Sequence, residues 1–293
     1  MNSRIAIRKA LAISVLIAST LATLRFPAGA SADAEYRVSP AGNAPAAAPQ
    51  SQGPTDPVEL EAFLDDLMAR DMQELHIAGV AVSVVKDGKL FFAKGYGYAD
   101  VEKGIPVDAE QTIFGIGSIG KLFTWTAVMQ QVEQGKLDLD ADVNTYLDFR
   151  IPDTFPQPIT LKHLMTHTAG FEDKLLGGLV TEPEELVPPR DWIVSHMPAR
   201  LYPPGHMPSY TNFNAVLAGY IVARVSGESY DQYIQNHIFS PLGMMHSTVQ
   251  TPLPPALSEY MSLGYTYGDG AFSRSRVSSR SRQVCLRDGT TPA

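Results

Sequence analysis

The feature that most constrains this chain is a glycine-rich turn that runs directly into an apolar helix. The turn reads Gly-Ile-Gly-Ser-Ile-Gly-Lys over residues 115–121. Apolar side chains then recur at helical spacing until Gly135 ends the pattern: Leu122, Trp125, Val128, Met129 and Val132. Residues three apart share a helix face, so Ser118 and Lys121 are expected side by side. A serine hydroxyl needs a nearby base to act as a nucleophile, and a neutral lysine can be that base.

A second Ser-x-x-Lys, formed by Ser83 and Lys86, provides an internal control. It lies in the β-branched run Val80–Val85, which Asp87-Gly88 closes, and this pattern predicts a strand that leads into a hairpin with Lys89–Tyr96. Because side chains three apart on a strand point to opposite faces, Lys86 cannot serve Ser83. We therefore expect the nucleophile at Ser118 alone.

The same glycines also allow a nucleotide-binding interpretation, through Gly-x-Gly-x-x-Gly and most of a phosphate-binding loop. The phosphate loop lacks its last member, because Leu122 stands where a magnesium-binding Ser or Thr is needed. The dinucleotide motif requires a buried strand before the glycines, and only Thr112-Ile113-Phe114 precedes them. The Gly-x-Ser-x-Gly nucleophile motif of the α/β-hydrolases is absent as well, because Ile116 occupies its first glycine position. Nucleotide binding through the Lys121 loop remains the weaker alternative.

A Tyr-x-Asn motif, Tyr210-Thr211-Asn212, follows the run Tyr202-Pro203-Pro204-Gly205. The clearest later helix is expected over Ala215–Val225, so Tyr210 falls in the loop just before it. Loops that rigid elements hold in place commonly carry catalytic side chains. Together with Ser118 and Lys121, Tyr210 is a candidate catalytic residue.

From about Leu60 to Met245 the chain resembles the serine β-lactamase and D,D-peptidase superfamily. The likeness is to its class C-like branch of β-lactamases, D-alanyl-D-alanine carboxypeptidases and esterases. Four stretches in the family order carry it: residues 114–121, residues 164–170 (Leu-Met-Thr-His-Thr-Ala-Gly), the Tyr202–Asn212 region, and Pro241-Leu242-Gly243-Met244. The resemblance implies an α+β fold, with one mixed lobe built on an antiparallel sheet and one helical lobe.

The resemblance also implies roles for the site residues. Ser118 would attack a carbonyl of a lactam, a D-alanyl peptide or an ester to form an acyl-enzyme, without a cofactor. Lys121 and Tyr210 would share general base and acid duty, and the sequence leaves open which of them is the base. Asn212 would bind the substrate's amide. A small-molecule or peptidoglycan-type substrate follows from these roles.

The chain departs from the family after Asn212, because no Lys-Thr-Gly or His-x-Gly follows it. Residues 273–293 are Ser/Arg-rich, without apolar periodicity, and are expected to be a disordered tail. The sequence therefore predicts a hydrolase domain over residues 58–272 that lacks its C-terminal strands. A truncated remnant that does not catalyse, or that only binds, is the alternative to an active enzyme.

The N-terminus has the pattern of a secretory signal over residues 1–32. Basic residues precede the apolar stretch Ala10–Leu24, and small residues follow it before Ala32. Residues 33–57, rich in Ala and Pro, read as a linker. We therefore expect an exported protein, periplasmic or secreted, with no stable membrane association beyond the signal segment.

Charge and histidine content narrow the remaining possibilities. The net charge is −8, although both the leader and the tail are basic, so the body between them is strongly acidic. An acidic body argues against nucleic acid as a partner. His163 and His167 are four apart, as in helical zinc sites, but no Glu follows His163 and no third ligand is evident. We therefore interpret both histidines as structural and expect no metal.

Overall fold

The computed structural model describes residues 53–173, 179–180, 187–275 and 282–283. Contacts divide the chain after Gly53, and the described fold belongs to the unit Pro54–Ala293. The predicted signal and most of the predicted linker, residues 1–52, lie outside the described residues. In the described part, no helix is long and apolar enough to cross a membrane.

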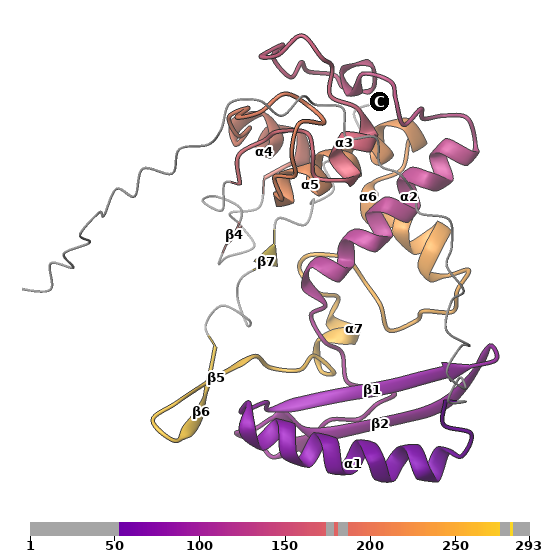
Figure 1. The fold of residues 1–293 in the computed structure, drawn as a ribbon, viewed down its shortest axis with the longest axis vertical. Helices are drawn as coiled ribbons and strands as arrows, with labels where there is room; N and C mark the ends of the chain where they lie inside the picture. Colours follow the sequence, from indigo (N-terminus) through magenta and orange to yellow (C-terminus); the bar gives the residue numbers. More distant parts are fainter. Residues whose placement is uncertain (1–52, 174–178, 181–186, 276–281, 284–293) are drawn as a thin grey trace, which may run out of the picture. The chain divides into compact units, whose positions relative to one another are not determined.

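The fold opens with a helix, and the predicted hairpin follows it as part of an antiparallel sheet (Figure 1). Helix α1 (Pro57–Glu74) is capped by Asp56, whose carboxylate accepts a hydrogen bond from the Val58 amide at 2.9 Å. Three strands then pair in the order β1-β2-β3: β1 (Gly79–Lys86), β2 (Lys89–Asp100) and β3 (Ile105–Pro106). The β1–β2 turn is Asp87-Gly88, and both residues have positive φ, as a tight hairpin turn requires.

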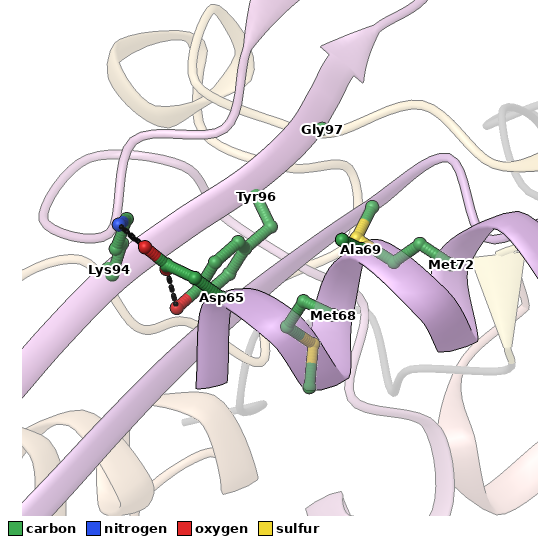
Figure 2. A pocket seen from close by; sticks show the side chains of 7 residues that line it. All are labelled: Asp65, Met68, Ala69, Met72, Lys94, Tyr96 and Gly97. Atoms are coloured by element: carbon green, nitrogen blue, oxygen red, sulfur yellow. Dashed lines mark hydrogen bonds and ion pairs between the residues drawn. The ribbon is translucent and has the colours of Figure 1, made fainter. Parts of the chain in front are cut away.

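Helix α1 is tied to the sheet by one charged cluster beside an open cavity of about 380 Å³ (Figure 2). The Lys94 ammonium lies 2.7 Å from both Glu61 and Asp65, and the Tyr96 hydroxyl donates to Asp65 at 3.0 Å. These hydrogen bonds raise the pKa of Lys94 and lower that of Asp65. The cluster fixes α1 against β2, and Met68 and Met72 of α1 line the cavity beside it.

The central part of the chain is helical. A 3₁₀ turn, η1 (Gly117–Gly120), leads into α2 (Lys121–Glu133). The elements that follow are η2 (Val143–Tyr146), α3 (Leu161–Met165), β4 (Leu179–Val180), α4 (Pro189–Ser195), α5 (Asn212–Ser226), α6 (Tyr230–Ile234), the π-helical turn η4 (Gln235–Phe239) and α7 (Pro255–Ser258). Helix α5 includes the predicted helix over Ala215–Val225, so Tyr210 does lie in the preceding loop.

The main buried core lies among these helices. Ala127 and Val128 of α2 and Leu217 and Ile221 of α5 are fully buried in one cluster. Burial of a valine, leucine or isoleucine side chain stabilises a fold by roughly 1.5–3 kcal/mol relative to exposure. The contact between α2 and α5 fixes the N-termini of both helices relative to each other. Lys121 and Asn212 are the first residues of those two helices.

The C-terminal segment differs from its prediction. Strands β5 (Tyr265–Gly268) and β6 (Ala271–Arg274) pair in a hairpin, in which Arg274 faces Tyr265 and Ser273 faces Thr266. The expected start of the disordered tail at residue 273 is therefore wrong, because backbone pairing orders this Ser/Arg-rich segment as far as Arg274. The short strand β7 (Arg282–Gln283) pairs with β4, also within the expected tail. The rest of the predicted tail, residues 276–281 and 284–293, lies outside the described residues.

Hydrogen bonds also join the segment before β5 to the N-terminal region. Ile113 donates to the Tyr260 carbonyl and accepts from Ser262, each at 2.8 Å, and Leu263 donates to the Ala99 carbonyl at 2.9 Å. These bonds extend backbone pairing beyond the sheet of β1, β2 and β3. Between these bonds, Met261 forms an isolated parallel bridge with Ile113.

Gly170 allows a close backbone contact that shapes the loop before α5. Its φ is +81°, and a Cβ at this position would lie 2.0 Å from the Tyr202 carbonyl oxygen. The Gly170 carbonyl accepts from Leu201 at 2.8 Å, and Gly205 donates to Thr168 at 2.8 Å. These contacts hold the segment that leads to Tyr210 against the end of α3.

We predict that Gly170→Ala destabilises the protein far more than Gly227→Ala. Gly227 also has positive φ, at +78°, but a Cβ added there would have no neighbour within 4 Å. Gly227→Ala should cost only the left-handed strain, roughly 1–2 kcal/mol. Gly170→Ala adds a backbone clash, which should raise the loss by a further ~1–3 kcal/mol. Urea unfolding of both variants measures the difference, and equal losses would show that the Tyr202 contact is easily relieved.

Candidate active site

The glycine-rich turn places Ser118 at an exposed position immediately before α2. Gly117 has a φ of +52°, a conformation that side-chain-bearing residues rarely adopt, so glycine suits the position next to the serine. Ser118 lies in the 3₁₀ turn rather than in the α-helix itself, and Lys121 is the first residue of α2. The 3₁₀ turn superposes residues three apart even more closely than an α-helix does.

The Lys121 ammonium bridges the two sequence motifs. Its Nζ donates to Ser118 Oγ at 3.0 Å and to Asn212 Oδ1 at 2.7 Å. Lys121 is half-buried, whereas Ser118 is exposed. Two side chains of the candidate site, Ser118 and Asn212, thus hold the ammonium. The predicted contact between Ser118 and Lys121 is present in the structure.

Tyr210 completes the cluster from the loop before α5. Its phenol oxygen lies 2.8 Å from Ser118 Oγ, and the Lys121 Nζ lies 4.9 Å from the centre of its ring. The Lys121 ammonium lowers the pKa of the Tyr210 phenol, and the hydrogen bond with Ser118 lowers it further, by a smaller amount. The structure therefore brings together all four residues that the sequence singled out: Ser118, Lys121, Tyr210 and Asn212.

The second Ser-x-x-Lys is not part of any such cluster. Ser83 lies on β1 opposite Ala93, with an exposed side chain, whereas Lys86 is half-buried and donates to the Pro54 carbonyl at 2.9 Å. The strand predicted for this segment is confirmed. Ser83 and Lys86 thus occupy alternate faces, as the strand geometry requires.

The two histidines play different parts. His163 accepts from the Thr160 amide at 3.2 Å through Nδ1 and caps the start of α3, so its structural interpretation is confirmed. His167 lies beside the cluster, with its ring centre 4.3 Å from that of Tyr210. Sequence reasoning missed this contact, and the only signal for it was the position of His167 in a stretch typical of the family. Among the described residues, no group of three or more potential ligands could hold a metal ion.

The cluster has the chemistry of an activated serine. A hydroxyl within hydrogen-bond distance of two groups that can take up or stabilise a proton is the usual arrangement for nucleophilic catalysis. The charged cavity at Asp65 and Lys94, in contrast, is lined only by residues of α1 and β2 and includes none of the four (Figure 2). The candidate active site is therefore the Ser118 cluster.

Comparisons with known proteins agree with the fold. The sequence model of the Beta-lactamase family matches residues 64–282, so the chain belongs to this family. Its fold is that of the serine β-lactamases and penicillin-binding proteins, a class of serine hydrolases with mixed helices and antiparallel sheets.

Three relatives illustrate the likeness. The protein PbpX of Bacillus subtilis is 38% identical over 178 residues, which are 60% of this chain and 42% of PbpX. The octameric penicillin-binding protein homologue from Pyrococcus abyssi is 31% identical, with a TM-score of 0.63 over 73% of this chain and 50% of that one. A class C β-lactamase is 26% identical, with a TM-score of 0.58 over 73% of this chain and 57% of that one. The chain thus spans about half the length of these relatives.

We predict that Tyr210 ionises below the ordinary tyrosine pKa of about 10. The pKa of Tyr210 is lowered, whereas burial and the Asp148 carboxylate raise that of Tyr220 to about 12. The difference in ultraviolet titration between the wild type and Tyr210→Phe should show one phenol ionising below about 10, the ordinary tyrosine pKa. Lys121→Met should move that ionisation upward, because it removes the stabilising cation. The matched control, Tyr220→Phe, should remove only a component near pH 12. A Tyr210 component at or above about pH 10 would contradict the geometry.

Proposed function

We propose that this chain is a serine hydrolase in which Ser118 forms an acyl-enzyme with a lactam, a D-alanyl peptide or an ester. The observation that carries the proposal is the simultaneous contact of Ser118 Oγ with Tyr210 at 2.8 Å and with Lys121 at 3.0 Å. An exposed serine with two such partners is poised to lose its proton while it attacks a carbonyl carbon.

The hydrogen-bond directions favour Tyr210 as the group that takes the proton. A lysine ammonium has three donors and no acceptor, so Lys121 donates to Ser118 Oγ and Asn212 Oδ1. If Tyr210 is the phenolate, its oxygen can only accept, so the Ser118 hydroxyl donates its proton to Tyr210 across the 2.8 Å contact. A neighbouring cation favours the phenolate, and the pKa of Tyr210 is lowered accordingly. The serine proton would pass to the phenolate as the new bond to the carbonyl carbon forms.

Lys121 and Asn212 would prepare the site for this step. The Lys121 ammonium would hold the phenolate, and the Asn212 side chain, fixed by Lys121, would orient the amide of a substrate through its remaining hydrogen-bonding capacity. The backbone N–H of Ser118, at the start of the 3₁₀ turn, would be one donor to the developing oxyanion. One such donor contributes about 10²–10³ in rate in other acyl-transfer enzymes.

Export is a further part of the proposal. It rests on the leader pattern in residues 1–32, with a peptidoglycan-type or small-molecule substrate outside the cytoplasm. N-terminal sequencing of the protein recovered from the periplasm or medium should begin after Ala30 or Ala32. Recovery of the intact leader in the cytoplasm alone would contradict export.

The substrate class can be resolved by three reporters. Nitrocefin, a D-Ala-D-Ala peptide and p-nitrophenyl acetate present lactam, D-alanyl and ester carbonyls to the same serine. The chain should be tested beside a full-length relative, because it spans only 42% of the length of PbpX. Turnover of one reporter by both proteins would identify the substrate class.

We predict that Ser118→Ala abolishes covalent labelling by a fluorophosphonate or a fluorescent penicillin. Ser83→Ala is the matched control, since it removes the serine of the other Ser-x-x-Lys motif and should leave labelling unchanged. Labelled gels of the three proteins at equal concentration measure the outcome. Labelling that survives in Ser118→Ala would place the nucleophile elsewhere.

We also predict that the losses of labelling rate caused by Tyr210→Phe and Lys121→Met are not multiplicative, because the two residues act together on Ser118. Each single variant should slow labelling by about 10²–10⁴, the usual contribution of general acid–base catalysis. The double variant should be no more than about tenfold slower than the worse single variant, because groups that act together lose their effect together. Thermal melting of all three variants controls for unfolding. Fully multiplicative losses would show that Tyr210 and Lys121 act independently.

A further inference from the structure

His167 connects the end of α3 to the Tyr210 segment through its backbone. Its φ is +55°, a left-handed conformation that turns the chain sharply after the helix. The His167 carbonyl accepts from the Ser209 amide at 2.7 Å, next to Tyr210 in the chain. The backbone of this one residue thus holds the start of the Tyr210-Thr211-Asn212 segment.

The side chain of His167 contacts the same segment. Its Nδ1 lies 3.5 Å from the Thr211 backbone nitrogen and 3.3 Å from Asn214 Nδ2. Thr211 is 1% exposed and Asn214 is fully buried, so solvent does not compete for these contacts. The ring itself lies against Tyr210 on one side and meets Trp125 of α2 edge-on, with ring centres 6.1 Å apart.

The Thr211 contact indicates which ring nitrogen carries the proton, whereas the roles in the Asn214 contact follow from the tautomer. A backbone N–H can only donate, so Nδ1 must present its lone pair to Thr211, and the proton of a neutral ring then lies on Nε2. If Nδ1 were protonated, its N–H and the backbone N–H of Thr211 would both be donors and would point at each other. It would also place a second positive charge near Lys121.

We propose that His167, as the neutral Nε2–H tautomer, is a positioning residue that holds Tyr210 and Asn212 in register with Ser118 and Lys121. This inference deepens the proposed function and rests on it for its kinetic consequence. His167 acts through the Tyr210 segment and touches neither Ser118 nor the reacting carbonyl. The site therefore requires that His167 remain unprotonated.

The surroundings of His167 agree with this requirement. The titratable groups that face it are Lys121 of α2 and Tyr210 itself, while Trp125, Thr211 and Asn214 carry none. Burial, and then the Lys121 charge, lower the pKa of His167 below its usual 6.5. The ring is thus neutral at pH 7, and acidification through its lowered pKa should loosen the Tyr210 segment.

Ring ¹⁵N NMR of the full chain tests the tautomer without reference to activity. The chain has seven histidines, and the signals lost in His167→Asn assign this one. We expect an unprotonated Nδ1 and a protonated Nε2 at pH 7, and a Thr211 amide shift that follows the His167 titration at a pKa below 6.5. A proton on Nδ1 at neutral pH, or a Thr211 amide that ignores the titration, would overturn the inference.

Two variants test the consequence for Ser118. His167→Asn places an amide oxygen near the position of Nδ1 and tolerates positive φ, whereas His167→Gln carries its amide at the Nε2 position. We expect the rate of fluorophosphonate labelling of His167→Asn to stay within about threefold of the wild-type rate. Labelling of this variant should also no longer decline in acid as the wild type does when His167 titrates. Labelling of His167→Gln should be about 10–100-fold slower than that of the wild type, because small misplacements of catalytic groups are costly. His237→Asn, which alters an exposed pair with Glu228, is the control.

Equal labelling of the two His167 variants would overturn the positioning role. Absence of labelling in the wild type, together with the expected tautomer, would instead contradict the proposed hydrolase function. The two failures are therefore distinguishable.

Discussion

The Lys121 ammonium is the interaction on which the site depends, because it joins two segments that lie 91 residues apart. It donates to Ser118 at the start of α2 and to Asn212 at the start of α5, and it lies over the ring of Tyr210. A half-buried cation between two hydrogen-bond acceptors is stable only where the backbone holds those acceptors in place. The buried contact between α2 and α5 provides that support.

The packing of the helical core therefore determines the geometry of the site. Residues of α2 and α5 that belong to the same buried cluster, such as Val128 and Leu217, set the separation of the two helix starts. The loop before α5 is also held by backbone contacts with Gly170 and His167. The consequence is an exposed serine whose partners come from elements with fixed positions, as nucleophilic catalysis requires.

The local parts of this arrangement could be predicted from the sequence. The contact between Ser118 and Lys121 follows from helical spacing, and the hairpin across Asp87-Gly88 follows from turn chemistry. The 2.8 Å contact between Tyr210 and Ser118 could not be derived in this way, because it depends on how α2 and α5 pack. Only the resemblance to a known family suggested it. The role of His167 was missed for the same reason, since its partners Thr211 and Asn214 lie 44 and 47 residues away in sequence. The order of β6 was missed because backbone pairing with β5, rather than an apolar pattern, holds Ser273.

The most direct test of the central claim is the mass of the acylated peptide. Trypsin cuts after Lys103 and Lys121, and Ser118 is the only serine between them, whereas Ser83 falls in the peptide that ends at Lys86. After incubation with a fluorophosphonate or a penicillin and digestion, we expect a covalent adduct on the peptide of residues 104–121. An adduct on the Ser83 peptide, or a full-length relative that is modified only outside the matching peptide, would contradict it.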